Sequence, residues 1–197
     1  MIPYGALRRL RRGVKVSAFV TLRCNFNCVY CSLKGYNGIM PTCEEISWDE
    51  WFKVFQKIEK TIPIQEVNIT GGEPTLRVGV GEFINRLLDT KKYMVSLYTN
   101  LNNDRIFGVI PNSKFRIIAT YHHDDDPVKY VKRYRKCRKI YRVILEEIDY
   151  QVIYGSRIKP YEKQGKGIGG QSDRFAIAPD GNAFLDMNRF FKHLRYE

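Results

Sequence analysis

The chain has 197 residues, 44% of them hydrophobic, and it carries a formal net charge of +12. This length and apolar content predict a single domain over residues 1–197 with a buried core. No run of about 18 apolar residues is present, so we expect no membrane-spanning helix. The basic residues 1–12 are followed by no apolar stretch, so we expect no secretory signal.

The cysteines and the charge bear on compartment and partners. The chain has five cysteines, an odd number, and three of them are clustered. This pattern argues against a disulfide framework and favours a reducing, cytoplasmic and anaerobic setting. The basic excess suggests an anionic partner or merely good solubility, and it carries no information on the fold.

The first part of the chain alternates predicted strands and helices. Residues 14–22 are rich in β-branched side chains and predict a strand. Ser47 and Glu50 form a capping-box pattern, so we expect a helix that starts there and stops at Pro63. Comparable patterns predict strands over 64–70, 93–99 and 115–121, a helix over 80–88 and a short helix over 103–110. Such alternation indicates a parallel sheet covered by helices.

The second part is less regular. A helix is expected over 128–142, capped by the acids 124–126. Strands over 143–148 and 150–154 both remain open. Residues 174–187 have the pattern of a β-hairpin. The apolar positions that recur at helical spacing, and so predict the core-facing side of the helix, are Tyr130, Tyr134, Cys137, Tyr141 and Ile144.

The other side of this helix is strongly basic. From Lys129 to Arg142 there are eight basic residues and no acid. Such a helix would lie outside the sheet, away from the strand ends where ligands bind, so we expect a surface and not a catalytic element. It is either solvated or in contact with RNA or another polyanion.

A group of cysteines follows the first predicted strand. Cys24, Cys28 and Cys31 are separated by three and then two residues. One loop can aim three thiolates at a single point, which is one fewer than a closed zinc site or an ordinary iron–sulfur cluster uses. An incomplete site can be catalytic, because a substrate or cofactor can take the vacant position on the metal.

A second motif, Gly71-Gly72-Glu73-Pro74, follows the strand predicted over 64–70. Together with the Cys-x3-Cys-x2-Cys loop and with Tyr30 before its last cysteine, it resembles the radical S-adenosylmethionine (SAM) superfamily. The resemblance implies an α/β fold, an incomplete open (β/α)6-type barrel of parallel strands over about 14–154, followed by a loop and a C-terminal β-hairpin over 155–197. The hairpin is similar to the start of the extension of peptide-modifying members, but no cysteine follows Cys137 to bind a further cluster.

The resemblance also implies cofactors and contacts. Cys24, Cys28 and Cys31 would bind a four-iron, four-sulfur ([4Fe-4S]) cluster whose fourth iron takes SAM. Cleavage of SAM would release a 5′-deoxyadenosyl radical that abstracts hydrogen from the substrate. Glu73 would accept a hydrogen bond from the methionyl amino group, and Tyr30 would lie along the adenine. The cofactor-binding positions implied in this way are Tyr30, Gly71, Gly72, Glu73, Pro74, Asn100, Thr120 and His122.

Several alternatives stay open at this point. His122 is either a cofactor or substrate contact or a surface histidine beside acids, and Cys43 is either a fourth zinc ligand or, as we favour, an inert thiol. An external low-potential electron donor such as flavodoxin or ferredoxin is implied. The substrate is open between a peptide, suggested by the hairpin, and a nucleotide or RNA, suggested by the charge. The oligomeric state is undetermined.

The competing hypothesis is a non-enzymatic, basic nucleic-acid-binding module with a structural metal site. The motif from Gly71 to Pro74 distinguishes the two hypotheses, because a zinc module has no need of it. The sequence therefore favours the enzyme.

Overall fold

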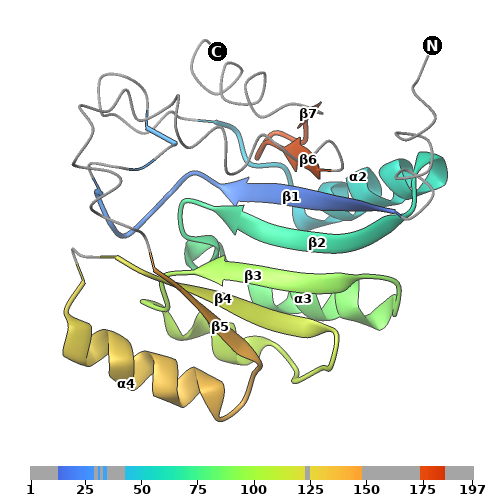
Figure 1. Cartoon of the computed structure of the whole chain (residues 1–197). Coiled ribbons are helices and arrows are strands. Elements are labelled where there is room, and N and C mark those ends of the chain that lie inside the picture. Colours follow the sequence, from blue (N-terminus) through green and yellow to red (C-terminus); the bar gives the residue numbers. More distant parts are fainter. Residues whose placement is uncertain are drawn as a thin grey trace.

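The computed structural model describes residues 13–28, 31, 33–34, 43–122, 125–147 and 174–184. Seven strands form one sheet in the order β5-β4-β3-β2-β1-β6-β7 (Figure 1). Strands β1 to β6 are parallel, and β7 is antiparallel to β6. The strands are β1 (Val14–Thr21), β2 (Ile64–Gly71), β3 (Met94–Thr99), β4 (Phe115–Tyr121), β5 (Val143–Glu147), β6 (Arg174–Ile177) and β7 (Ala183–Phe184). The expected open sheet of parallel strands is confirmed.

Three α-helices pack on one face of this sheet. They are α2 (Trp48–Thr61), α3 (Val80–Asp89) and α4 (Pro127–Arg138), and two short 3-10 turns, η1 (Pro74–Leu76) and η2 (Asp104–Gly108), follow β2 and β3. Trp51 and Phe55 of α2, Leu87 of α3 and Cys137 of α4 all belong to the main hydrophobic core. That core also contains alternate residues of β1 to β4, so the helices cover the apolar side of each strand.

Local sequence signals set the helix ends. Ser47 and Glu50 form the predicted capping box at the start of α2, with each side chain bonded to the other residue's backbone N–H. Asp126 caps α4 through the backbone N–H groups of Val128 and Lys129. Among the described helices, none is long and apolar enough to cross a membrane.

The predicted end of the basic helix was wrong. Helix α4 ends at Arg138, four residues early, and the chain turns so that Tyr141 still reaches the core. Ile144 lies in β5 and is 36% exposed, so it is not on the helix face. Ile144 matched the helical spacing of the preceding apolar residues only by chance. The strand expected over 143–148 is confirmed as β5, and the one expected over 150–154 lies outside the described residues.

The C-terminal hairpin is also confirmed, in a place that the sequence did not indicate. Strand β6 pairs in parallel with β1, opposite β2, and so extends the main sheet. The turn into β7 contains Gly181 with φ of +86°, and its N–H donates to the carbonyl of Ala178 over 2.9 Å. The hairpin is therefore a part of the sheet rather than an appendage.

Candidate cluster and cofactor site

The two glycines after β2 lie against the chain that leaves β1. The N–H of Gly72 donates to the Thr21 carbonyl, and the N–H of Glu73 donates to the Arg23 carbonyl, each over 2.8 Å. A Cβ on Gly71, which has φ of +137°, would lie 2.1 Å from the Thr21 oxygen, and one on Gly72 would lie 2.3 Å from the Arg23 oxygen. Only glycine permits this approach. The turn therefore holds the base of the cysteine loop.

Glu73 connects this turn to the end of β3. Its Oε1 accepts hydrogen bonds from the Thr75 N–H (3.0 Å), the Thr75 hydroxyl (2.5 Å) and the Thr99 hydroxyl (2.8 Å). Its Oε2 accepts from the Asn100 N–H over 2.8 Å. The residue is 1% exposed, and burial raises the pKa of its carboxyl while these hydrogen bonds oppose the rise. Neither threonine stood out in the sequence.

Asn100 joins the end of β3 to the cysteine loop. Its side-chain N–H donates to the Asn25 side-chain oxygen over 2.8 Å, and the Asn25 amide N–H donates to the Asn102 carbonyl over 3.4 Å. Asn100 itself is buried. The predicted position thus lies at the site, and the structure gives it a role in fixing the loop.

None of the three cysteines of the loop forms a disulfide. Cys28 is buried, whereas Cys24 and Cys31 are half-buried. Burial raises the pKa of Cys24, and the nearby charges of Glu73 and Cys31 add to the rise. In the described part of the chain, no three His, Cys, Asp or Glu side chains are gathered closely enough to hold a single metal ion. A [4Fe-4S] cluster does not require this, because each thiolate would bind a different iron, so three thiols on one loop fit the group.

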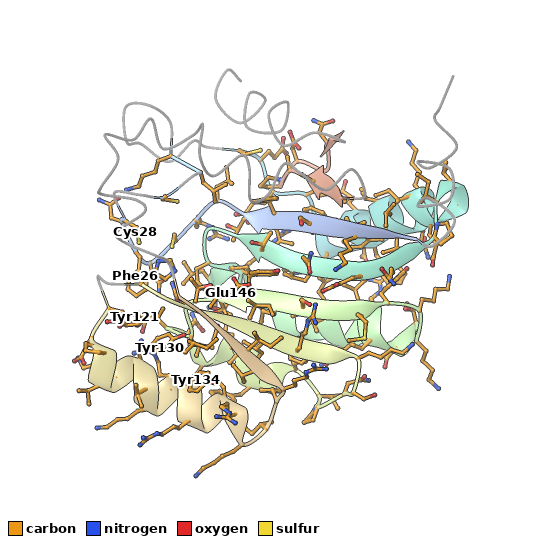
Figure 2. The ribbon with its side chains drawn as sticks, viewed as in Figure 1. Phe26, Cys28, Tyr121, Tyr130, Tyr134 and Glu146 are labelled. Carbon is orange, nitrogen blue, oxygen red and sulfur yellow. The ribbon has the colours of Figure 1, made fainter. Side chains whose placement is uncertain are left out.

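His122 lies against the cysteine loop at the end of β4. Its Nδ1 is 3.4 Å from the Sγ of Cys28, and its ring centroid is 5.5 Å from that of Phe26. Next to it, the ring of Tyr121 meets that of Tyr130 on α4 at 5.0 Å. Figure 2 shows Cys28, Phe26, Tyr121 and Tyr130 together at this end of the sheet.

This arrangement corrects one expectation about the basic helix. Helix α4 begins at Pro127, soon after His122, so its N-terminal end lies at the strand ends and not away from them. The physical reason is the parallel topology, in which the helix after β4 has to start at the carboxyl end of that strand.

The remaining predicted positions have varied surroundings. Pro74 is buried and begins η1, and Thr120 is half-buried near the end of β4. Cys43 is half-buried and packs with Cys31 against a small cluster of Leu22, Leu33, Ala176 and Ala178. Cys137 is in the core as expected, where burial raises the pKa of its thiol to about 11. Tyr30 lies outside the described residues.

The sequence missed an ionic brace beneath the loop. Glu45 accepts a hydrogen bond from the Thr21 hydroxyl over 2.5 Å and forms ion pairs with Arg23 (3.0 Å) and Arg77 (3.6 Å). Arg77 also donates to the Val20 carbonyl over 2.7 Å. These partners are more than twenty residues apart, and no local pattern identifies them.

The parallel sheet, the cysteine loop and the glycine turn define a class of enzyme. The family model described as "Radical SAM superfamily" matches residues 19–149, and the chain belongs to this superfamily. Members of this superfamily are enzymes that use a [4Fe-4S] cluster and SAM, so membership makes the protein an enzyme and argues against the non-enzymatic alternative.

Individual relatives and a solved structure are also similar to the chain. A probable GTP 3′,8-cyclase of Methanopyrus kandleri is 40% identical over 95 residues, covering 48% of this chain and 28% of the relative. The GTP 3′,8-cyclase of Aquifex aeolicus is 29% identical and covers 95% of this chain and 56% of the relative. The chain thus spans about half the length of the Aquifex relative and less than a third of the Methanopyrus relative. The crystal structure of BtrN with AdoMet and 2-DOIA has a TM-score of 0.60 at 14% identity, covering 90% of this chain and 74% of BtrN, and it supports the fold alone.

Proposed function

We propose that Cys24, Cys28 and Cys31 hold the [4Fe-4S] cluster and that the enzyme uses it to cleave SAM reductively. The cluster, when bound, supplies the electron that splits SAM into methionine and a 5′-deoxyadenosyl radical. The observation that carries the proposal is the turn from Gly71 to Glu73, which is hydrogen-bonded to the base of the cysteine loop. Cluster and SAM would then be held by two segments that are fixed to each other.

The protein's own contribution is to bind and orient the cofactor. Among the described residues, the Oε2 of Glu73 has one donor, from Asn100, and so offers a further lone pair for the amino group of SAM. The carbonyl groups of the glycine turn offer further acceptors. Tyr30, Thr120 and His122 are proposed contacts to the rest of SAM. Asn100 and Pro74 hold the turn and the strand end in place.

We propose a purine nucleotide as the substrate. The support is that several curated relatives are named GTP 3′,8-cyclases. The argument for a peptide came from the hairpin, and this argument weakens because β6 is a sheet strand paired with β1. We further propose a cytoplasmic enzyme that receives electrons from an external donor such as flavodoxin or ferredoxin.

Anaerobic reconstitution tests the proposed function. The protein is loaded with iron and sulfide, reduced with dithionite and given SAM, and 5′-deoxyadenosine is measured by chromatography. We expect absorbance near 400 nm and slow formation of 5′-deoxyadenosine without substrate, with faster formation when GTP is added. A colourless protein that binds zinc and forms no 5′-deoxyadenosine would contradict the proposal.

A further inference from the structure

The sheet face opposite the helices carries a row of polar side chains. Residues in register on neighbouring strands are Ser17 of β1, Asn68 of β2, Ser96 of β3 and Arg116 of β4. Their strand neighbours on the other face, such as Val67, belong to the core under the helices. Adjacent strands are about 4.8 Å apart, so the row extends over roughly 14 Å. Parallel strands are ordinarily apolar on both faces, so this row is unusual for the architecture.

One part of this face is a satisfied ionic network. Glu66 lies two residues before Asn68 on β2, on the same face. It accepts a hydrogen bond from the Ser96 hydroxyl over 2.7 Å and forms ion pairs with Arg116 and, over 3.4 Å, with Lys15. Arg116 also donates from Nε to the Ser96 oxygen over 2.8 Å. Burial opposes ionisation of Glu66, but the hydrogen bond from Ser96 and the charge of Arg116 hold the pKa of its carboxyl below its ordinary value. The guanidinium of Arg116 is thereby fixed in position.

Asn68 differs from this network because its amide oxygen is buried without a hydrogen-bond partner among the described residues. The residue is 4% exposed, and within the described part of the chain its Oδ1 has no hydrogen-bond partner. Leaving a buried amide unpaired is unfavourable, and native structures keep few such groups. Local conflicts of this kind are expected at functional sites.

We propose that Asn68, with Arg116 two strands away on the same face, recognises the base of the nucleotide substrate. The proposal rests on the proposed function for the identity of the substrate. A carboxamide presents an acceptor next to a donor, which complements a nucleobase edge with a donor next to an acceptor, and a guanidinium suits the acceptors of guanine. A bound base would supply the donor that Asn68 lacks.

The position along the strand agrees with this assignment. Asn68 precedes Gly71 by three residues, which corresponds to about 10 Å along β2. Gly71 belongs to the turn proposed to hold SAM. A nucleotide with its base on the polar row would extend along the face toward the strand ends, which would bring its sugar toward the turn proposed to hold SAM.

The test is Asn68→Leu, which keeps the approximate volume and removes the amide. Binding of GTP is measured by equilibrium dialysis with the reconstituted enzyme in the presence of SAM, and Tm is measured in parallel. We expect the Kd for GTP to rise about tenfold or more, since at least one hydrogen bond between neutral groups is lost at the base. We expect Tm to stay equal or rise, because a side chain with an unpaired buried oxygen is replaced by an apolar one.

A matched control and a second variant complete the test. Gln65→Leu changes an exposed amide of the same strand and should alter neither the Kd for GTP nor that for SAM. If Asn68→Leu does not fold, Asn68→Asp keeps the shape, replaces the donor by a charge, and should weaken GTP binding in the same way. An unchanged Kd for GTP overturns the inference, whatever the change in Tm.

Failure of the inference is distinguishable from failure of the proposed function. If the parent enzyme forms 5′-deoxyadenosine from SAM but binds neither GTP nor ATP, the SAM chemistry stands and the base-recognition site is wrong. If the parent forms no 5′-deoxyadenosine at all while GTP binding depends on Asn68, the site stands and the SAM chemistry fails.

Discussion

At the scale of single residues, the site depends on groups that cannot be exchanged for similar ones. Gly72 has its Cβ position filled by the carbonyl groups of Leu22 and Arg23, at 2.6 and 2.3 Å. Glu73 satisfies two backbone N–H groups and two hydroxyls at once. Both residues therefore stabilise the fold at the place where we propose that the cofactor binds. Substitutions should reduce stability and SAM binding together.

The first prediction concerns the cysteines. Cys24→Ala, Cys28→Ala and Cys31→Ala should each abolish retention of the cluster, because each removes the only protein ligand of one iron. The measurements are iron content and absorbance near 400 nm after anaerobic reconstitution. Cys43→Ala and Cys137→Ala serve as controls and should keep the cluster. An equal loss of iron in Cys43→Ala would mean that four cysteines bind the cluster. No iron would then be left open for SAM.

A second prediction concerns Glu73. Glu73→Ala leaves four donors without an acceptor in a buried place, and each costs about 1–3 kcal/mol. We expect the free energy of unfolding to fall by at least about 3 kcal/mol, measured by urea denaturation, with SAM binding lost as well. Glu82→Ala, which alters an exposed acid of α3, should change neither quantity. A fully stable Glu73→Ala variant that only binds SAM weakly would assign the carboxylate to the cofactor alone.

At the scale of elements, α4 combines a core side with an exposed basic side. Tyr130 and Cys137 are buried, while Lys132, Arg135 and Lys139 are exposed. The apolar side chain of Val128 is also exposed, at 63%, in the first turn. That turn lies at the end of the sheet where His122 contacts Cys28. The basic side runs from this turn to the far end of α4 and suits an acidic electron-donor protein, because complementary charge speeds encounter.

The third prediction tests this surface by charge reversal. The triple variant Lys132→Glu, Arg135→Glu and Lys139→Glu should slow flavodoxin-driven formation of 5′-deoxyadenosine at least about tenfold at low salt, and the parent rate should fall as salt screens the charges. With dithionite as reductant, the variant should match the parent, since no docking is needed.

Reversal of Lys53, Lys57 and Lys60 provides the control for this experiment. These lysines are exposed on α2 and carry the same charge, so the number of substitutions and the change in net charge are identical. Equal effects of the two triple variants would mean that total charge matters and α4 has no special role. Loss of RNA binding by the α4 variant, with unchanged electron transfer, would assign the surface to a nucleic acid instead.

At the scale of the whole molecule, the sequence predicted what is local and missed what is tertiary. Periodicity identified β1 to β4 and placed the cysteine loop and Gly71–Pro74 at one edge of a parallel sheet. It did not indicate that β6 pairs with β1, because these strands are 159 positions apart in the register Lys15↔Arg174 and nothing local encodes the pairing. The contacts of Asn25 and Glu45 were missed for the same reason.

The way these distant segments meet leads to the last prediction. The ends of β1, β2 and β3 are joined by the bonds of Gly72 to Thr21, of Glu73 to Asn100 and of Asn100 to Asn25. A ligand bound at these ends should therefore stabilise the whole sheet and not one loop. SAM at 100 times its Kd contributes about 2.7 kcal/mol to stability, which corresponds to a rise in Tm of about 5–11 °C for a domain of this size.

Calorimetry and hydrogen exchange measure this effect and locate it. The Tm of the reconstituted enzyme should rise with SAM, and backbone amides at the ends of β1, β2 and β3 should exchange more slowly, whereas the far end of α4 around Arg138 should not respond. The Cys28→Ala variant, which is expected to lack the cluster, should show a much smaller rise because the amino and carboxylate groups of SAM would have no iron to bind. A rise of the same size in that variant would mean that SAM binds without the cluster, and protection confined to the cysteine loop would show that the three strand ends do not act as one unit.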